Sequence, residues 1–349
     1  MIHRVRKAVN AILGGHAYLV GGAVRDWVIN PSASPKDYDF VTPLPVEEVI
    51  ALVKVAGRRV YDVGTRHGTM GFKCPVVLAD GSTVFIMVEV TTFRSEVYTP
   101  GSRQPTVTFD VTDIVDELSR HDFTMNAIAL SPAGHVIDPF NGRADIAQGV
   151  IRAVGIPTRR FKEDPLRILR GYRFAARFGF TVDPKTQRSM TKYAHRILEC
   201  SKERWTQELD KLLTAECVES GLRQLWAGNL FKFMVPELHV QFDYDQCSPY
   251  HAFPLHEHTI RVVGACEPDA DIRWAALLHD VGKPASMTRK ANGQQNYIHH
   301  AAIGAELVDG IARRLKWSKA RRLFVMEAVR DHLEDGSWLK LADCGAQKL

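Results

Sequence analysis

Short runs of apolar and β-branched residues alternate with turn signals from residue 1 to about residue 138. The runs are AYLV, YDFVT, RRVYDVG, TMGFKCPVVL and STVFIMVEVTTF. One stretch among them, PVEEVIALVKVAG, spaces its apolar residues as a helix does. Period-two runs bounded by turns predict strands, and a helix set among them predicts an α/β or α+β domain built around a sheet.

The pattern becomes helical from about residue 139. One apolar stripe has the spacing i, i+1, i+4, i+7 and i+8, which predicts an amphipathic helix; it consists of Ile168, Leu169, Tyr172, Ala175 and Ala176. From about residue 226 the pattern stays helical but becomes rich in histidine. We therefore expect an α+β protein with three regions: 1–138, 139–225 and 226–349.

Composition places the chain among ordinary folded proteins. Its 349 residues are 45% hydrophobic and 24% charged, enough for two or three domains with real cores. No apolar run approaches the ~18 residues of a membrane span, and the start does not resemble a signal peptide. The 6 cysteines form no CxxC pair, which favours reduced thiols in a cytoplasm over a zinc knuckle or a disulfide framework.

Positive charge is concentrated in one stretch, Ile151–Phe180. It holds eight Lys and Arg against Glu163 and Asp164, an excess of +6, whereas the whole chain carries +5. Such a stretch suits a polyanion such as nucleic acid or a nucleoside triphosphate. The alternative is a solvated helix face with no partner.

Two aspartates one residue apart, Asp37 and Asp39, follow the first predicted strand. If KDYDFV is a strand, both carboxylates project from one face and Tyr38 and Phe40 point to the core. Two neighbouring carboxylates repel unless a cation lies between them, and such pairs hold Mg²⁺ together with substrate phosphate oxygens. A solvated pair at a loop edge is the alternative.

A glycine turn precedes the aspartates. Gly21 and Gly22 lie between an apolar strand and a predicted helix containing Ala23 and Val24. Backbone without a Cβ lets amide N–H groups approach a phosphate, and a helix start adds its dipole. Arg25 would help to hold the triphosphate or stiffen the turn, so the stretch predicts a phosphate site beside a metal site.

A third carboxylate, Glu89, lies in the run STVFIMVEVTTF. Val84, Ile86, Val88 and Val90 alternate there with Phe85, Met87 and Glu89. Glu89 is the lone acid on its face and needs a metal or a cation as partner. Two roles of Glu89 are therefore compatible with the sequence: a position beside the metal, or a salt bridge to Arg94.

An ordered series of motifs resembles the class II tRNA nucleotidyltransferases, the CCA-adding branch of the polymerase-beta-like superfamily. The series is LVGGAVRD…DYDF, VGTRHGT, SRHDFTMNAIAL, DPFNGRADI, EDPLRILRGYRFAARFGF and KERWTQELDKLL. It covers roughly the first 215 residues. The resemblance implies a nucleotidyltransferase head followed by an all-helical region that selects nucleotides and binds RNA.

The resemblance also assigns roles in the head. Asp37 and Asp39 would bind two Mg²⁺ ions that activate the RNA 3′-hydroxyl and the triphosphate. The family's Arg-Arg-Asp motif, which contacts the ribose, stands here as Arg120-His121-Asp122. Histidine lacks the bidentate donor of arginine, so nucleotide binding is assigned to Arg120 and Asp122 and a supporting role to His121. Read from its own residues, the stretch is a helix start followed by core.

The family motif Glu-Asp-x-x-Arg falls on Glu163, Asp164 and Arg167. Asp164 and Arg167 lie on one helix face and would offer an acceptor and a donor to the base edge, with Arg170 also binding nucleotide and Glu163 and Arg173 in support. The alternative for Asp164 is an N-cap before a proline. Arg204 and Glu208, at i and i+4, are expected to pair and to support the recognition helix.

The histidines of the last region resemble the HD phosphohydrolase superfamily. His258 is followed by the doublet His279-Asp280 and then by His300, His332 and Asp343. Imidazoles and carboxylates from several helices hold divalent transition metals such as Ni²⁺ or Mn²⁺. The resemblance implies that the first metal is bound by His258, His279, Asp280 and Asp343. His300 and His332 would face the substrate or bind a second metal.

The expected function is addition of C, C and A to the 3′ end of tRNA from CTP and ATP, with a phosphatase or 2′,3′-cyclic phosphodiesterase activity in the HD region. Expected partners are the tRNA acceptor arm and 3′ end, with no membrane, for a monomer or homodimer. Alternatives are a poly(A) polymerase and an enzyme adding only C or only A. A third alternative is an alarmone synthetase-hydrolase, but such enzymes carry the HD domain before the synthetase, which is the opposite of the order here. A fourth is an RNA-binding module that has lost its catalytic sites, and the intact motifs argue against it.

Overall fold

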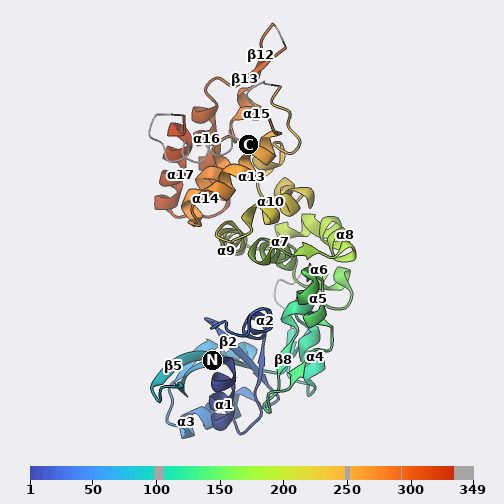
Figure 1. The fold of residues 1–349 in the computed structure, drawn as a ribbon, viewed down its shortest axis with the longest axis vertical. Helices are drawn as coiled ribbons and strands as arrows, with labels where there is room; N and C mark the ends of the chain where they lie inside the picture. Colours follow the sequence, from blue (N-terminus) through green and yellow to red (C-terminus); the bar gives the residue numbers. More distant parts are fainter. Residues whose placement is uncertain (98–105, 248–251, 292, 334–349) are drawn as a thin grey trace. The chain divides into compact units, whose positions relative to one another are not determined.

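The computed structural model describes residues 1–97, 106–247, 252–291 and 293–333. The chain divides into two compact units, Met1–Arg160 and Phe161–Leu349. The first is built around a sheet and the second is largely helical (Figure 1). The expected α+β class is confirmed.

A seven-stranded mixed sheet organises the first unit, in the order β3-β4-β5-β2-β1-β8-β9. β2 is antiparallel to β1 and parallel to β5, and β4 is antiparallel to both β3 and β5. The strands are β1 (Tyr18–Val20), β2 (Tyr38–Thr42), β3 (Val60–Gly64), β4 (Thr69–Val77), β5 (Thr83–Thr92), β8 (Ala129–Leu130) and β9 (Val136–Ile137). Every strand expected from the alternating pattern is therefore present.

Helices pack on both faces of this sheet. The first-unit helices are α1 (Ile2–Ile12), α2 (Gly22–Ile29), α3 (Val46–Val55), α4 (Ile114–Ser119) and α5 (Gly142–Gln148). Apolar residues of α1, α2 and α3 pack with the inward residues of β2, β4 and β5 into one core. Tyr38 and Phe40 are buried in that core, as the alternation in KDYDFV predicts. The opposite face carries a second, smaller core that includes Val41 of β2 and Leu118 of α4, and Asp39 and Glu89 on that face are exposed.

Shorter elements complete the first unit. They are β6 (Ser95–Val97), which pairs with β7 (Thr106–Thr108), β10 (Val150–Ile151) and the 3-10 turns Thr65–His67 and Thr124–Asn126. The expectation that FTMNAIAL begins a helix is wrong: α4 ends before it, and the stretch forms a 3-10 turn and then β8. Residues 122–130 are all buried, so its role as core is confirmed.

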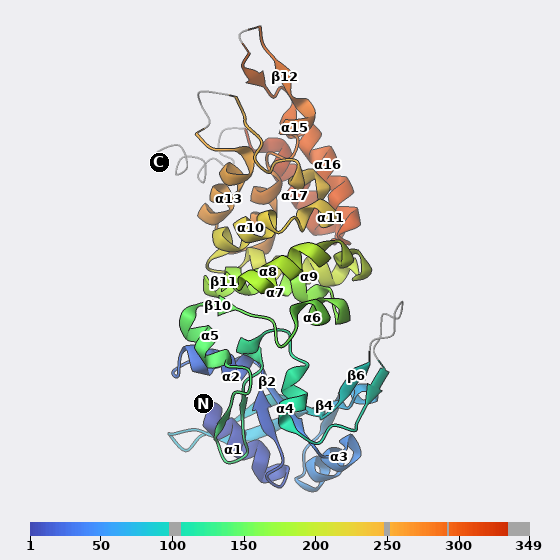
Figure 2. The same cartoon turned by 90° about the vertical axis from the view of Figure 1, so that its right-hand side faces the viewer.

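The second unit is a stack of helices (Figure 2). They are α7 (Leu166–Phe178), α8 (Pro184–Tyr193), α9 (Lys202–Leu213), α10 (Val218–Ala227), α11 (Phe231–Met234), α12 (Pro236–His239), α13 (Leu255–Ala265), α14 (Ala270–Leu278), α15 (Lys283–Ser286), α16 (His300–Arg314) and α17 (Lys319–Asp331), with α6 (Pro157–Glu163) before them and a 3-10 helix over Ala194–Glu199. The helical character predicted for this part of the chain is confirmed, and short strands interrupt the helices: β11 (Thr181–Val182) and a hairpin of β12 (Thr288–Arg289) and β13 (Gln295–Asn296).

Three tryptophans centre the core of the second unit. Trp205, Trp226 and Trp274 are fully buried, and each indole N–H donates a hydrogen bond: to Ile197 O, Leu238 O and Asp210 Oδ1 respectively. Burying so large a side chain removes much apolar surface from water, and the bonded N–H avoids an unpaired polar group. The predicted stripe on α7 is also confirmed, because all five of its residues are buried.

No described helix is long and apolar enough to cross a membrane. The described cysteines Cys74, Cys200, Cys217, Cys247 and Cys266 are all free thiols.

Two glycines offer a matched test of the helical packing. A Cβ on Gly221 of α10 would lie 2.4 Å from the Cβ of Ala176 on α7, whereas a Cβ on Gly310 of α16 would meet nothing within 4 Å. Gly221→Ala should lower the free energy of unfolding by about 1–3 kcal/mol, because the two helices must separate. Gly310→Ala should raise it by about 0.5–1 kcal/mol through lower chain entropy. Denaturant unfolding of both variants checks this, and equal effects would contradict it.

Candidate functional site

The glycine turn and the Asp39 carboxylate lie side by side in the first unit. Gly21 has φ 69°, in the left-handed region that favours glycine, and α2 begins immediately after it. A Cβ on Gly21 would lie 3.6 Å from Asp39 Oδ2. The β1–β2 register, which pairs Val20 with Asp39, produces this proximity. The turn and the first carboxylate therefore form one local site.

Glu89 lies beside Asp39, because the parallel β2–β5 register pairs these two residues. Asp39 keeps an exposed surface, yet its carboxyl is crowded. Partial desolvation, followed by repulsion from Glu89 and then from Asp37, raises the pKa of Asp39 to about 6. The register places Glu89 next to Asp39, whereas Arg94 donates from its guanidinium to His67 O and from its backbone N–H to Glu117.

Arg25 is buried and links α2 to the segment of Asp122. Its guanidinium donates to Asp26 Oδ1 at 2.7 and 2.9 Å and to Asn126 Oδ1 at 2.7 Å. Asn126 in turn donates to Asp122 Oδ1 at 2.8 Å. This geometry supports the option that Arg25 stiffens the turn. Sequence reasoning missed Asn126, whose only signal is its place four residues after Asp122.

Arg120 and Asp122 have different surroundings. Arg120 donates to both carboxylate oxygens of Glu117, at 2.7 and 3.2 Å, and Glu117 is buried. Asp122 is buried and also accepts the backbone N–H of Phe123 at 2.8 Å. His121 between them is half-buried. Each of these residues is held by neighbours, which fixes the motif in one conformation.

Asp164 in the second unit has two partners, one for each carboxylate oxygen. Its Oδ1 accepts the N–H of Leu166 at 3.0 Å, which is the local cap that the Asp-Pro sequence predicts. Its Oδ2 accepts from Arg204 at 2.8 Å, across 40 residues of sequence. Asp164 therefore caps the helix through one oxygen while its other oxygen pairs with Arg204, whose side chain is 48% exposed to solvent.

The expected pairing of Arg204 with Glu208 is wrong. Arg204 reaches Asp164 instead, and Glu208 is buried and pairs with Arg173 of α7. The spacing i, i+4 permits a pair within α9, but α9 packs on α7 and a buried carboxylate takes the buried guanidinium available there. Arg167 pairs with Glu163 at 3.0 Å, so Arg167 and Arg173 of α7 each have an acidic partner.

The basic stretch is less exposed than its charge count suggests. Arg160 and Arg173 are each only 7% exposed, and Arg160 donates to Ser119 O. Arg170 is half-buried, with its guanidinium carbon 5.5 Å from the centre of the Phe174 ring. Part of the predicted basic surface is therefore internal structure.

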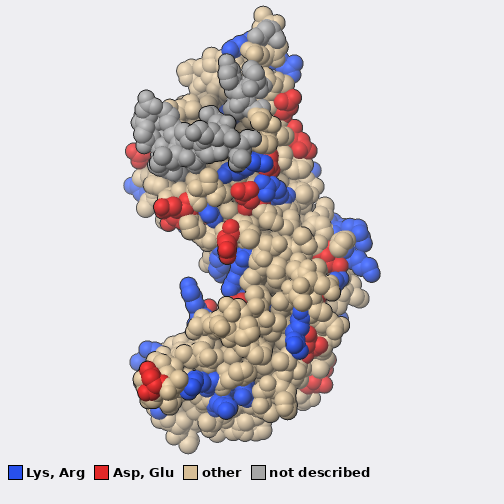
Figure 3. Space-filling model, viewed as in Figure 1, with Lys and Arg blue, Asp and Glu red and all other residues tan. Residues whose placement is uncertain are grey.

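Basic side chains gather instead over α8, where Figure 3 shows a group of blue atoms. Lys185, Arg188 and Lys192 are exposed and stand at i, i+3 and i+7, on one face of this helix. The opposite face, with Thr186, Ser189 and Met190, is buried. α8 thus offers a basic strip that sequence reasoning did not single out.

The histidines of the HD-like region converge from four helices. His258 lies in α13, His279 follows α14, His300 begins α16 and His332 follows α17. Nδ1 of His279, His300 and His332 donates in each case to the backbone carbonyl three residues earlier, at 2.7, 2.8 and 2.7 Å. These bonds fix the orientation of each ring and aim its Nε2 at the neighbouring side chains, which is the arrangement found in metal-binding histidines.

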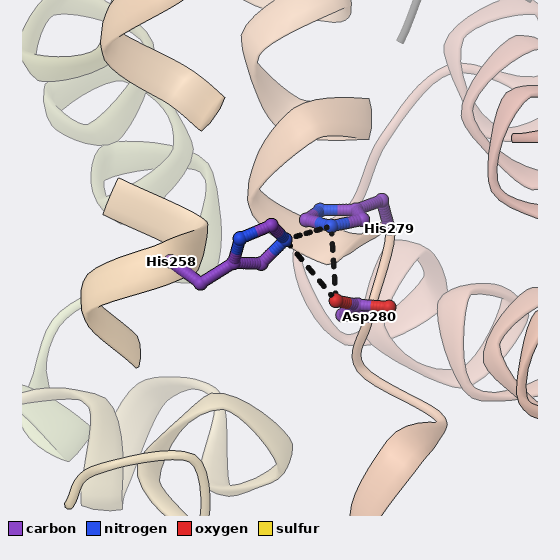
Figure 4. A group of neighbouring side chains, drawn as sticks. All are labelled: His258, His279 and Asp280. Atoms are coloured by element: carbon purple, nitrogen blue, oxygen red, sulfur yellow. Dashed lines mark hydrogen bonds and ion pairs between the residues drawn. The ribbon is translucent and has the colours of Figure 1, made fainter. Parts of the chain in front are cut away.

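Asp280 lies between two pairs of these imidazoles. Its Oδ2 is 3.1 Å from His279 Nε2 and 3.5 Å from His258 Nε2 (Figure 4). Its Oδ1 is 3.3 Å from His300 Nε2 and 3.8 Å from His332 Nε2. The Nε2 atoms are 3.2 Å apart within each pair. Asp280 thus belongs to two groups with the spacing of metal ligands.

Charge explains how Asp280 stays ionised although it is fully buried. Burial alone would raise its pKa, but His279, the Lys283 ammonium and the hydrogen bonds from His279 and His300 hold the pKa well below its usual value. Lys283 Nζ is 2.7 Å from Oδ2. Burial, then the neighbouring His279, lowers the pKa of His332 to about 4, so His332 is neutral at pH 7 and able to bind a metal.

Backbone contact fixes the spacing of this site. A Cβ on Gly282 would lie 2.1 Å from the carbonyl oxygen of His300 and 2.7 Å from the nitrogen of Gly304. The turn after the His-Asp doublet therefore packs directly on the first turn of α16. No residue larger than glycine fits there without moving the helix that carries His300.

The candidate metal ligands of the two units differ in chemistry and in how closely their donor atoms approach one another. In the second unit, the Nε2 atoms of two histidine pairs lie on either side of the Asp280 carboxylate, a set of donors that suits divalent transition metals. Asp343, the expected fourth ligand, lies outside the described residues. Among the described residues of the first unit, Asp37, Asp39 and Glu89 do not close into a group with donor atoms within 4.8 Å of one another; such a site would complete its coordination with substrate oxygens.

Three family models match successive parts of the chain. The "Poly A polymerase head domain" matches residues 17–152, the "Probable RNA and SrmB- binding site of polymerase A" 179–242 and the "HD domain" 255–346. A solved structure of the Bacillus stearothermophilus CCA-adding enzyme in complex with CTP aligns over 100% of this chain and 84% of its own, with a TM-score of 0.61 and 27% identity. These matches make the chain similar to CCA-adding enzymes that carry a C-terminal HD domain.

Curated CCA-adding enzymes are similar to this chain over part of their length. The CCA-adding enzyme of Levilactobacillus brevis is 40% identical over 221 residues, which are 63% of this chain and 52% of that protein. The CCA-adding enzyme of a Geobacillus species is 38% identical over 221 residues, 63% of this chain and 51% of that protein. The chain spans about half the length of the curated relatives it matches.

The raised pKa of Asp39 gives a pH-dependent prediction for the metal-free protein. The folded state holds this proton more tightly than the unfolded state between about pH 4 and pH 6, so ionised Asp39 costs stability above pH 6. Asp39→Asn should therefore protect the β2 and β5 amides from hydrogen exchange at about pH 8, with the gain shrinking toward about pH 5. A gain independent of pH, or a loss at pH 8, would contradict the crowded carboxylate.

Proposed function

We propose that this protein adds C, C and A, one nucleotide at a time, to the unpaired 3′ end of tRNA, using CTP and ATP. The observation that carries the proposal is the Asp39 carboxylate placed against the Gly21 turn and beside Glu89. Carboxylates next to a glycine turn at a helix start suit a triphosphate and its metal. The relatives named CCA-adding enzymes support the choice of reaction.

In this proposal the first unit carries the chemistry. Asp37 and Asp39 hold Mg²⁺, which supplies charge neutralisation for in-line transfer and pyrophosphate release. Gly21 and Gly22 present backbone N–H groups to the triphosphate. Arg25 and Asn126 keep α2 fixed against the segment of Asp122, which orients the sugar together with Arg120.

Base selection belongs to Asp164 and Arg167 in the second unit. Both are partly exposed and both are restrained, Asp164 by Leu166 N–H and Arg204, and Arg167 by Glu163. A restrained acceptor and donor can read the edge of C or A without a nucleic-acid template. The exposed strip of Lys185, Arg188 and Lys192 would contact tRNA phosphates by charge rather than by sequence.

The HD region would hydrolyse phosphate esters, as a phosphatase or a 2′,3′-cyclic phosphodiesterase. His258, His279, His300, His332 and Asp280 would hold divalent transition metal, such as Ni²⁺ or Mn²⁺, which supplies a nucleophile from water near neutral pH. The protein's own contribution is the Nδ1 bonds that aim each Nε2 and the buried position of Asp280. A poly(A) polymerase, or an enzyme adding only C or only A, is the alternative for the first unit.

Incubation with tRNA lacking its last three nucleotides tests the first activity. With labelled CTP and ATP, we expect C, C and A to be added in order and addition then to stop. Asp39→Ala should reduce addition by at least about 100-fold while tRNA binding stays near normal, since the carboxylate acts on the reacting groups. A long A tail would favour the poly(A) polymerase, and a single added species the restricted enzymes.

The matched variant for the other region is His279→Ala. It should leave nucleotide addition unchanged but abolish Mn²⁺- or Ni²⁺-dependent hydrolysis of a 2′,3′-cyclic nucleotide, whereas Asp39→Ala should spare that hydrolysis. Loss of both activities in either variant would contradict this division of labour.

Arg204 is predicted to affect nucleotide choice more than stability. Arg204→Met removes an exposed ion pair worth less than about 1 kcal/mol, but it frees Asp164 Oδ2 and should reduce discrimination of CTP and ATP against UTP and GTP. Arg173→Met strands buried Glu208 and should cost about 3–5 kcal/mol of unfolding free energy. Misincorporation assays and denaturant unfolding separate the two effects; unchanged discrimination in Arg204→Met would remove Arg204 from the recognition site.

A further inference from the structure

Lys283 is a buried lysine directly beside the candidate metal ligands. It is 6% exposed and begins α15, three residues after Asp280. Its Nζ lies 2.7 Å from Asp280 Oδ2 and donates to Gln246 Oε1 at 3.0 Å. The Tyr297 ring centre is 5.7 Å from Nζ, and the Tyr297 hydroxyl donates to the backbone oxygen of Gln246. The ammonium is therefore fixed in place by several groups.

The two carboxylate oxygens of Asp280 have unequal surroundings. Oδ2 faces His258 and His279 and also accepts from Lys283. Oδ1 faces His300 and His332. The ammonium and any cation bound by the first pair of histidines must therefore share one oxygen atom.

We propose that Lys283 sets the metal affinity of the HD site, by neutralising Asp280 when the site is empty of metal and by repelling a divalent cation at Oδ2. Like charges a few ångströms apart in a buried site interact strongly, because little water screens them. The inference rests on the metal role proposed for the HD region. It adds a residue that holds no metal yet determines how readily metal enters and leaves.

This arrangement has two consequences for the protein. Without metal, Asp280 is not left as an uncompensated buried charge, so the HD region folds before it is loaded. With metal, the site binds weakly enough to exchange its ion, which makes occupancy depend on the concentration of metal around the protein.

The test measures Mn²⁺ binding rather than hydrolysis. All variants are made in the full chain carrying Asp37→Ala and Asp39→Ala, so that the first unit contributes no binding. By calorimetric titration of the chelator-treated protein, Lys283→Met should bind Mn²⁺ at least about tenfold more tightly than its parent. Lys283→Arg keeps the cation and should stay within about threefold of the parent.

Lys290→Met, which removes an exposed lysine of the same unit, is the matched control and should change nothing. Lys283→Gln provides a second neutral variant in case Lys283→Met does not fold, with circular dichroism as the check. Both neutral variants should unfold at a lower temperature than the parent without metal and gain more from added Mn²⁺.

Equal or weaker Mn²⁺ binding in both folded neutral variants would overturn the inference. His279→Ala in the same background separates this failure from a failure of the proposed site. If His279→Ala binds Mn²⁺ as the parent does, the metal role of the HD region is wrong. If it loses binding while the neutral Lys283 variants are not tighter, only the role of Lys283 is wrong.

Discussion

Compensation of buried or crowded charge governs how both units are built. A charged group taken from water needs a partner of opposite sign, or it costs more than packing returns. Glu208 pairs with Arg173, Glu117 pairs with Arg120, and Asp280 pairs with Lys283 and the neighbouring histidines. Asp39 is the contrast, because its closest charged neighbours, Glu89 and Asp37, have the same sign. A carboxylate left in that condition marks a position where a cation from outside the chain is expected.

The pattern of apolar and polar residues predicted the features that depend on neighbouring residues in the sequence. Alternation predicted β2 and β5 and the inward position of Tyr38 and Phe40, although β2 begins only after Asp37. The helical stripe of α7 was likewise visible, because burial of one face leaves a period in the sequence. α1 was missed, although its apolar residues at Ile2, Val5 and Val9 have helical spacing, since its polar residues dilute the signal.

The same pattern could not predict which residues of different elements contact one another in the folded protein. Arg204 and Glu208 have the spacing of an ion pair, but each found a partner on another element, as the packing of α7 on α9 determines. The charge count over Ile151–Phe180 could not distinguish the buried Arg160 from the exposed Arg177. In the HD region the motif order identified the histidines, whereas the shared use of Asp280 and the presence of Lys283 depend on how four helices meet.

The contact between Gly282 and α16 has a consequence for how an HD region of this kind could change over time. The distance between the two oxygen-facing histidine pairs is set by backbone against backbone, not by side chains that can adjust. The two candidate metal positions, one on each side of Asp280, are therefore expected to be conserved or lost together. A side chain gained at position 282 would displace His300 and Asp280 together, so we expect such a site to be kept whole or lost whole, with few intermediates that retain half of it.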